Sequence, residues 1–520
     1  MSWSHHEPHD HHRHHRGSAP HQGDHPLDVD AKEKTTKRQP LPIVALAIIC
    51  CLVGVWSVFS AGIIGQDWQM YPLILSGVML GFISLFEIRV GLAVLLLAIG
   101  LSPELSLYGV SNFRYEDLIF PILFFVWLTR HVLNRQKFQP TDLKAPILAL
   151  VFLALVSSLN NHIYGELNLG TAVFRFGKGI QYYFIFIIVL NTLTTPRDLK
   201  SFVWMLILTS SVVGVYGVTQ YEMFSGAGIP FRVTGPPGET ANILGGYYVF
   251  HICIAVGLMT TVKTPLRIIL ILYVGLMLAP LIGTLSRTSY VALSLGFFVV
   301  WFISRNRALA WVLALVAIFA LLAPEVTSHR FWSIFGIFDG NSPSSWIARV
   351  DGWRLFLKAF WEAPLLGHGV GRNPLGAVDN EYVLQMNELG LLGLVAFLWL
   401  IGRCLRSSVH LLPLRKTGNA DPTLQGFALG YFGGLVALLV HSIGATTFTT
   451  IRTTEPFFFA TGMLYAYWNL VRGPMRHTAH TDAHSFTAPP MIGRVELGKP
   501  EWLVEAEKKP QFLKRPGSPT

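Results

Sequence analysis

Two kinds of side chain that could perform group transfer gather in one polar stretch, residues 345–388. Its clustered acids are Asp379, Glu381 and Glu388, and its cations include Arg349 and Arg372. A guanidinium group binds two phosphate oxygens at once, and a carboxylate at a bilayer edge can serve as a general base. The pattern indicates a reaction site that handles an anionic substrate. The alternative is a structural network in which the acids pair with the arginines.

The same stretch contains a glycine-rich turn, Pro364-Leu-Leu-Gly-His-Gly-Val-Gly371, and leads into the apolar run 389–401. Glycine permits sharp turns of the backbone. His368 lies between two of these glycines and is a further acid–base candidate. His251 and His441, by contrast, lie inside apolar runs, and we expect them to be hydrogen-bonded core residues. A polar loop that ends on an apolar helix predicts chemistry at a membrane surface.

A second polar segment, residues 231–242, places Arg232 and Glu239 around a Gly-Pro-Pro-Gly turn. Thr240 is predicted to cap the helix that follows, whose free amide groups attract anions. Together with Arg232, these amides would suit a phosphate group. An ordinary turn between two helices explains the same residues.

Three further cations stand at the ends of apolar runs. Arg287 lies within Ser286-Arg-Thr-Ser289, where hydroxyl groups flank it, and Arg175 and Lys178 are spaced to share one helical face. Charged groups at membrane depth are costly and are therefore functional candidates. For Arg287 the alternative is a side chain that extends to the membrane–water interface.

Membrane helices must position these groups. The 520 residues are 52% apolar and only 13% charged, whereas about a quarter of a soluble domain is charged. The predicted fold is an all-α, polytopic transmembrane helix bundle of about 12–14 spans, each near the roughly 20-residue length that crosses a bilayer, with a large loop at 324–382 before the last spans. The apolar windows are 42–64, 71–86, 88–107, 116–133, 145–160, 173–192, 200–223, 241–262, 266–285, 288–304, 307–323, 383–404, 424–445 and 455–472.

The distribution of positive charge assigns the two sides of the membrane. When the windows alternate from an inside start, most lysines and arginines fall in inner loops, as cytoplasmic loops require. This places both termini in the cytoplasm and the loop 324–382 outside. The histidine-rich residues 1–40 and the residues 473–520 are predicted to be disordered tails on either side of a membrane domain, 41–472. Loose metal binding is an alternative role for the histidine-rich tail.

Several classes of function find no support in the sequence. The net charge of +10 reflects loops on one side of the membrane, so we expect no nucleic-acid partner. The chain lacks a phosphate-binding P-loop, a dinucleotide fingerprint, an HExxH motif and paired CxxC motifs. We therefore expect no metal and no cofactor.

Taken in order, the motifs resemble the O-antigen ligase and O-antigen polymerase superfamily of bacterial envelopes, over roughly residues 40–472. The resemblance implies a bundle of about a dozen membrane helices with a large periplasmic loop, in the bacterial inner membrane. It also implies a metal-independent glycosyltransferase of the GT-C type. The motifs are Arg232-Val-Thr-Gly with Asn242, Thr284-Leu-Ser-Arg287, Arg349-Val-Asp-Gly-Trp353, Pro364 to Gly371, Asp379-Asn-Glu-Tyr-Val and Glu388-Leu-Gly-Leu-Leu-Gly393.

The resemblance implies transfer of a glycan from undecaprenyl diphosphate to an acceptor sugar at the periplasmic face. The acceptor is lipid A–core in the ligases and another lipid-linked repeat unit in the polymerases. By the resemblance, Arg232 and Arg287 hold the donor diphosphate. The residue types alone add four candidates to that role, namely Arg349, Arg372, Arg175 and Lys178.

One departure from the family pattern affects the choice between these reactions. Family ligases usually carry a His-Asn pair where this chain has Asp379-Asn380. The departure favours a polymerase of exopolysaccharide or O-antigen over a ligase of lipopolysaccharide biosynthesis. The candidates for the base are Asp379, Glu381, Glu239 and His368.

We therefore predict an inner-membrane glycosyltransferase that inverts the anomeric carbon by direct displacement. Its partners would be the undecaprenyl diphosphate-linked donor, a glycan or lipid-linked acceptor, the membrane and a regulator of chain length. A transporter or flippase of an anionic lipid-linked glycan is an alternative, because it too would use outer cations. A structural membrane scaffold is a third.

Overall fold

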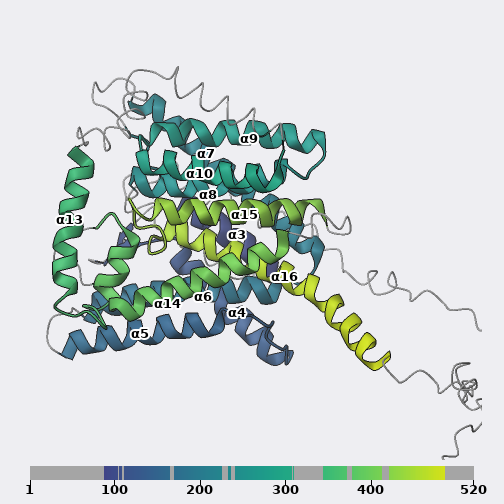
Figure 1. Cartoon of the computed structure of the whole chain (residues 1–520), viewed down its shortest axis with the longest axis horizontal. Helices are drawn as coiled ribbons and strands as arrows, with labels where there is room; N and C mark the ends of the chain where they lie inside the picture. Colours follow the sequence, from purple (N-terminus) through teal and green to yellow (C-terminus); the bar gives the residue numbers. More distant parts are fainter. Residues whose placement is uncertain are drawn as a thin grey trace, which may run out of the picture. The chain divides into compact units, whose positions relative to one another are not determined.

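The computed structural model describes residues 83, 87–102, 105–107, 110–163, 169–224, 232–235, 240–306, 309, 344–371, 378–412 and 421–485. The chain divides into two units, residues 1–46 and 47–520, and all described residues belong to the second. Their structure is helical apart from one short hairpin (Figure 1). The helices are α3 (Ile88–Leu101), α4 (Glu116–Leu133), α5 (Lys144–Ile163), α6 (Leu169–Thr192), α7 (Pro196–Phe224), α8 (Ala241–Met259), α9 (Thr264–Gly283), α10 (Arg287–Ser304), α13 (Ser344–Phe360), α14 (Glu381–Leu411), α15 (Pro422–His441) and α16 (Ile451–Ser485).

The predicted all-α membrane bundle is confirmed over these residues. Eight helices, α5 to α10 with α14 and α15, are long and apolar enough to cross a membrane. The exception to the all-helical prediction is an antiparallel hairpin between α3 and α4, in which β1 (Leu105–Leu107) pairs with β2 (Val110–Phe113). The predicted helix 455–472 corresponds to α16, which begins earlier and continues to Ser485.

Other sequence predictions fall on residues that lie outside the described part of the chain. These are the spans 42–64 and 307–323 with nearly all of 71–86, the tails 1–40 and 486–520, and most of the loop 324–382. Within that loop the structure describes α13 and the segment that follows it, residues 361–371.

Helix α8 is the most enclosed helix of the bundle, since every residue from Leu244 to Met259 is buried. It packs against α9, α10, α15 and α16 (Figure 1). Its contact with α15 is close because glycines remove side chains from the interface. A Cβ atom on Gly430 would lie 2.6 Å from the Cα atom of Ile254. Gly426, Gly430 and Gly434 recur every four residues along α15, the small-residue spacing that lets membrane helices approach closely.

Helix α14 is broken at Gly390, whose backbone has φ 69° and ψ −167°. The predicted glycine-rich turn lies beside this break. The amide of Leu391 donates to the carbonyl of Pro364 (2.9 Å), and the amide of His368 donates to the carbonyl of Asn387 (2.8 Å). Asn161 of α5 closes the arrangement by donating to the carbonyl of Gly367 (3.1 Å). The break therefore exchanges helical hydrogen bonds for bonds to the turn, as a buried backbone in a membrane requires.

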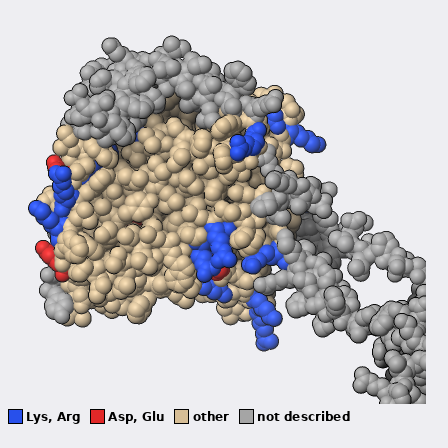
Figure 2. Space-filling view, viewed as in Figure 1, with Lys and Arg blue, Asp and Glu red and all other residues tan. Residues whose placement is uncertain are grey.

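Charged side chains gather at two opposite edges of the described surface, with a broad uncharged surface between them (Figure 2). One of these edges lies over α13, which carries Arg349, Arg354 and Lys358. An uncharged band between two charged edges is the pattern expected of a protein that crosses a bilayer.

Candidate functional site

A cavity of about 460 Å³ lies beside the first turn of α8, along α5, α6 and α14 as far as Ile401, and beside the first part of α16. One part of its wall is apolar and aromatic, and includes Phe174, Tyr183, Phe397 and Phe458. The other part is polar. This mixture suits a ligand with both an apolar and an anionic portion. The polar lining residues are Arg114, Arg175, Lys178, Thr240, Asn242, Asp379, Gln385, Glu388, Thr446, Thr449 and Thr450.

Asp379 and Asn380 begin α14 in two different roles. Asp379 lines the cavity, its side chain is 48% exposed, and it accepts a hydrogen bond from Nε of Arg349 at 3.2 Å. Asn380 is the helix cap, because its side-chain oxygen accepts from the amide of Val383 (3.1 Å). Its side-chain nitrogen donates to the carbonyl of Ile443 (3.1 Å). Asp379 therefore faces the cavity, whereas Asn380 fixes the helix end to the loop after α15.

Glu381 is fully buried, and protein donors surround its carboxylate. Oε2 accepts from the amides of Thr447 (2.8 Å) and Phe448 (2.9 Å) and from the hydroxyl of Thr449 (3.3 Å). Oε1 accepts from the side chain of Gln385 (2.9 Å). The carboxylate thus holds the loop 445–450, which forms part of the cavity wall.

Arg232 forms hydrogen bonds with residues of two separate sequence motifs, those of Thr284 and Asn242. Its Nε donates to the carbonyl of Thr284 (2.8 Å), and a terminal nitrogen donates to Oδ1 of Asn242 (3.1 Å). Arg287 begins α10 three residues after Thr284 and is half-buried. The two arginines predicted to bind the diphosphate are therefore brought to one turn, beside a residue of the cavity wall.

The first turn of α8 is also held in place. Thr240 caps it, as predicted, with its hydroxyl accepting from the amide of Ile243 (3.4 Å). The ring of His441 lies 3.1 Å from the carbonyl oxygen of Asn242 and 2.9 Å from the hydroxyl of Thr447. His441 is thus a buried, hydrogen-bonded histidine, as expected, and His251 is likewise buried, 2.9 Å from the carbonyl of Tyr247.

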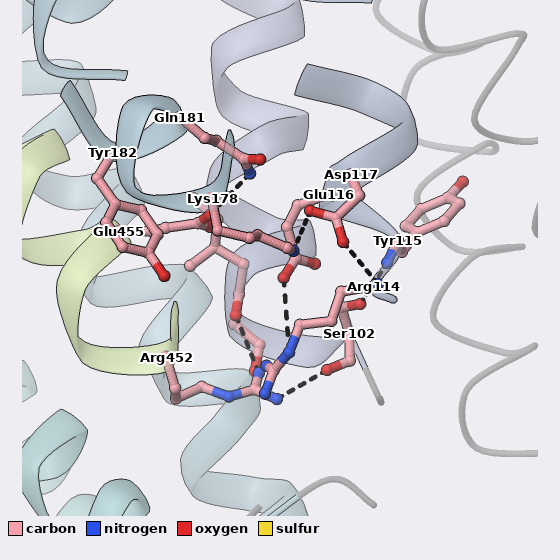
Figure 3. Close-up of polar contacts among 12 residues, drawn as sticks. Ser102, Arg114, Tyr115, Glu116, Asp117, Lys178, Gln181, Tyr182, Arg452 and Glu455 are labelled. Carbon is pink, nitrogen blue, oxygen red and sulfur yellow. Dashed lines mark hydrogen bonds and ion pairs between the residues drawn. The ribbon is translucent and has the colours of Figure 1, made fainter. Parts of the chain in front are cut away.

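A buried charge cluster adjoins the cavity (Figure 3), and we use this name for Arg114, Glu116, Asp117, Lys178, Arg452 and Glu455. Lys178 forms an ion pair with Asp117, and Nε of Arg114 lies 3.9 Å from Glu116. Gln181 donates to Oε1 of Glu455 at 2.8 Å. Of these residues, Arg114 and Lys178 also line the cavity. Arg114 and Lys178 therefore place positive charge in the cavity wall, and the acids of the cluster compensate this charge.

Arg452 belongs to the same cluster but serves a different element (Figure 3). It is completely buried and donates to the carbonyl oxygens of Ile99, Gly100 and Ser102 (2.9 Å to Ile99 and 2.7 Å to Ser102). These carbonyls end α3 and have no helical partner. Arg452 of α16 thus caps the end of α3.

The structure distributes the predicted site residues unevenly. Asp379, Arg175 and Lys178 line the cavity. Glu381, Arg349 and Arg232 form hydrogen bonds with residues of its wall, and Arg287 lies three residues after Thr284, whose carbonyl accepts from Arg232. His368 is buried in the glycine-rich turn, with its ring 3.9 Å from Glu362. Glu239 and Arg372 lie outside the described residues.

Sequence reasoning did not single out Glu116, Asp117 or Glu455. The signal was present, because an acidic residue inside or at the start of an apolar run is rare. Glu388 was singled out only as one of three clustered acids, and Gln385 was not singled out. The structure separates Glu388 from Glu381, since Gln385 and Glu388 line the cavity and Glu381 is buried outside its lining.

Residues 272–398 match the family model described as O-antigen ligase. No curated protein matches the chain. The matched region contains Arg287, Arg349, Asp379, Glu381 and Glu388, whereas Arg175, Lys178 and Arg232 lie outside it. The match supports the resemblance to the O-antigen ligase and polymerase superfamily, and with the apolar helices it indicates a multi-pass membrane enzyme.

Proposed function

From the premise that residues 272–398 carry an O-antigen ligase domain, we propose that this protein is an inner-membrane glycosyltransferase. It moves an oligosaccharide from undecaprenyl diphosphate to an acceptor sugar hydroxyl on the periplasmic face. The single observation that carries the proposal is the cavity, which combines cations, a carboxylate pair and an apolar wall beside the first turn of α14.

The proposed reaction is a direct displacement. The acceptor oxygen attacks the anomeric carbon, and the bond between that carbon and the diphosphate oxygen breaks. Negative charge grows on the leaving diphosphate, so fixed cations stabilise the transition state more than the ground state. We assign this role to Arg232, Arg287 and Arg349, with Arg175 and Lys178 deeper along the wall. The aromatic part of the wall would contact the first isoprene units of the lipid.

We propose polymerisation rather than ligation because the acidic Asp379 lies in the cavity wall just before α14, in contact with Arg349. The family ligases usually carry histidine at this position. In a polymerase the acceptor is itself a lipid diphosphate, and two anionic substrates would use cations on two walls of the cavity. Arg175 on α6 lies in one wall, and Arg349 on α13 stands behind another, where it pairs with the lining residue Asp379.

The test is turnover by the purified full-length protein in nanodiscs, with an undecaprenyl diphosphate-linked repeat unit from the native cell. A ladder of longer lipid-linked glycans is expected from the wild type, and Arg287→Ala should abolish it. Arg403→Ala is the matched control, because Arg403 lies in the second half of α14, pairs with Asp142 and is not among the residues that line the cavity. If only added lipid A–core receives the glycan, the protein is a ligase. Absence of transfer to either acceptor contradicts the proposal.

Two observations favour a second candidate, the transport of a lipid-linked glycan. A broken membrane helix and charges buried in the bundle interior are features of transporters, and α14 with the buried charge cluster provides both. The discriminating experiment places the protein in liposomes with fluorescent lipid-linked glycan and measures its movement between leaflets. Movement without new glycosidic bonds would replace the transferase by a flippase.

A further inference from the structure

Two acids line the cavity, Asp379 and Glu388, and their surroundings differ. Asp379 is engaged by the guanidinium of Arg349 at 3.2 Å. Among the described residues Glu388 forms no salt bridge, and its one hydrogen bond comes from the backbone amide of Gly371 to Oε1 at 3.0 Å. A single amide donor leaves most of the acceptor capacity of a carboxylate unused.

The second oxygen of Glu388 remains accessible on a residue that lines the cavity. Within the part of the chain that the structure describes, Oε2 has no hydrogen-bond partner and is not among the fully enclosed polar atoms. The residue as a whole is only 6% exposed. A carboxylate that is buried except for one oxygen facing a cavity is placed to act on a bound molecule rather than on bulk water.

The backbone of Glu388 is fixed by the break in α14. Its carbonyl oxygen accepts from the hydroxyl of Ser157 (2.9 Å) and from the amide of Gly369 (3.0 Å). The glycine-rich turn therefore holds this residue twice, through Gly369 at the main chain and Gly371 at the side chain. Precise placement of a reacting group by neighbouring hydrogen bonds is what general-base catalysis requires.

The charged neighbours of Glu388 come from two helices. Arg175 of α6, which also lines the cavity, interacts with it electrostatically, and Glu381 lies two turns away on α14. Helix α5 packs against this part of α14 and the turn, and the side chains with which it forms hydrogen bonds there, Ser157, Ser158 and Asn161, are uncharged. A cation and a carboxylate on facing parts of the wall can act on the two partners of one transfer, the leaving phosphate and the attacking hydroxyl.

We infer that Glu388 is the base that accepts the proton of the acceptor sugar hydroxyl, an assignment that rests on the proposed function. The O–H bond breaks and its proton passes to Oε2 of Glu388. The oxygen electron pair forms the new bond to the anomeric carbon, and the electrons of the broken bond leave on the diphosphate. The proton then passes from Glu388 to the released diphosphate or to water, which restores the carboxylate.

Glu381 cannot take this part, because its oxygens already accept from Thr447, Phe448, Thr449 and Gln385 and it is 0% exposed. Of the two acids that line the cavity, Asp379 is therefore the competitor of Glu388 for this role.

The experiment compares steady-state glycan transfer by the wild type, Glu388→Gln and Glu388→Asp in nanodiscs. For Glu388→Gln we expect kcat to fall about 10²- to 10⁴-fold, with the donor KM within about threefold of the wild type. Glu388→Asp keeps the carboxylate in a retracted position and should give an intermediate kcat. The decline of kcat at acid pH should be present in the wild type and absent in Glu388→Gln. Glu362→Gln, an exposed acid before the same turn, is the matched control and should keep the wild-type rate.

A Glu388→Gln protein that keeps kcat within about threefold overturns the inference and leaves the proposed function intact. The same holds if Asp379→Asn, and not Glu388→Gln, removes the acid decline of kcat. If the wild type transfers no glycan at all, the proposed function falls and the inference falls with it. If Glu388→Gln does not fold, the kcat of Glu388→Asp decides, since an unchanged rate there overturns the assignment.

Discussion

Gly367 and Gly390 meet backbone to backbone, each with a φ of +69°. A Cβ atom on Gly367 would lie 2.6 Å from the amide nitrogen of Gly390, and one on Gly390 would overlap the carbonyl group of Leu365. The combination of φ and ψ at Gly390 is open essentially to glycine alone. This pair of glycines is what allows the turn to enter beside the break in α14.

Gly390→Ala should therefore destabilise the protein by more than about 2 kcal/mol, since backbone strain alone costs about 1–3 kcal/mol and the clash with Leu365 adds to it. Thermal unfolding in one detergent measures the change. Gly402→Ala in the same helix is the control, because its added Cβ would meet no atom within 4 Å. Alanine there should stabilise α14 by up to about 1 kcal/mol. Equal melting temperatures for the two variants would contradict the described break.

The close contact between α8 and α15 predicts a second loss of stability. Gly430→Ala introduces a Cβ against the backbone of Ile254 and Cys253, so the helices must separate, at about 1–3 kcal/mol. Gly275→Ala in α9 has open space around it and should leave the unfolding temperature unchanged or slightly higher. A Gly430→Ala protein as stable as the Gly275→Ala protein would show that the helices are not this close.

Glu381→Gln tests the structural role of that carboxylate. The amide of glutamine has one acceptor oxygen where the carboxylate uses two, so its NH2 group must face a donor, either Gln385 or the amides of Thr447 and Phe448, and an unsatisfied buried group costs about 1–3 kcal/mol. We expect a lower unfolding temperature and a reduced yield of folded protein, whereas Glu388→Gln should unfold close to the wild-type temperature. The reverse order of stabilities would exchange the roles of the two acids.

The ion pair between Lys178 and Asp117 predicts a coupling that a double-mutant cycle can measure. Lys178→Met leaves a buried, uncompensated carboxylate and should cost about 3–5 kcal/mol. Adding Asp117→Asn removes that charge while its side-chain oxygen can still accept from the amide of Arg114. The double variant should therefore be more stable than Lys178→Met alone. If the double variant loses as much stability as Lys178→Met and Asp117→Asn lose together, the two residues do not form an ion pair.

The sequence predicted the helices well because apolar runs of the right length form spans almost independently of their neighbours. The cap at Thr240 and the common position of Arg175 and Lys178 depended on residues at most three positions apart, so local rules were sufficient. Short-range patterns thus gave the elements and several of their polar ends.

The assignment of roles within the site was beyond local rules. Glu381 and Glu388 look equivalent in the sequence, and only the contacts of α14 with the loop 445–450 and with the turn 364–371 separate them. Likewise, the bond between Arg232 and the carbonyl of Thr284 joins positions 52 residues apart. Such pairings depend on how the helices assemble, which no periodicity encodes.

The capping of α3 by Arg452 has a consequence for biosynthesis. The three carbonyl groups that end α3 receive their donor from a residue at least 350 positions later in the chain. The membrane interior offers no water to serve in its place. The end of α3 is therefore completed only after the ribosome has made α16. A nascent chain must keep α3 near the translocation machinery, or shield its end, until α16 arrives.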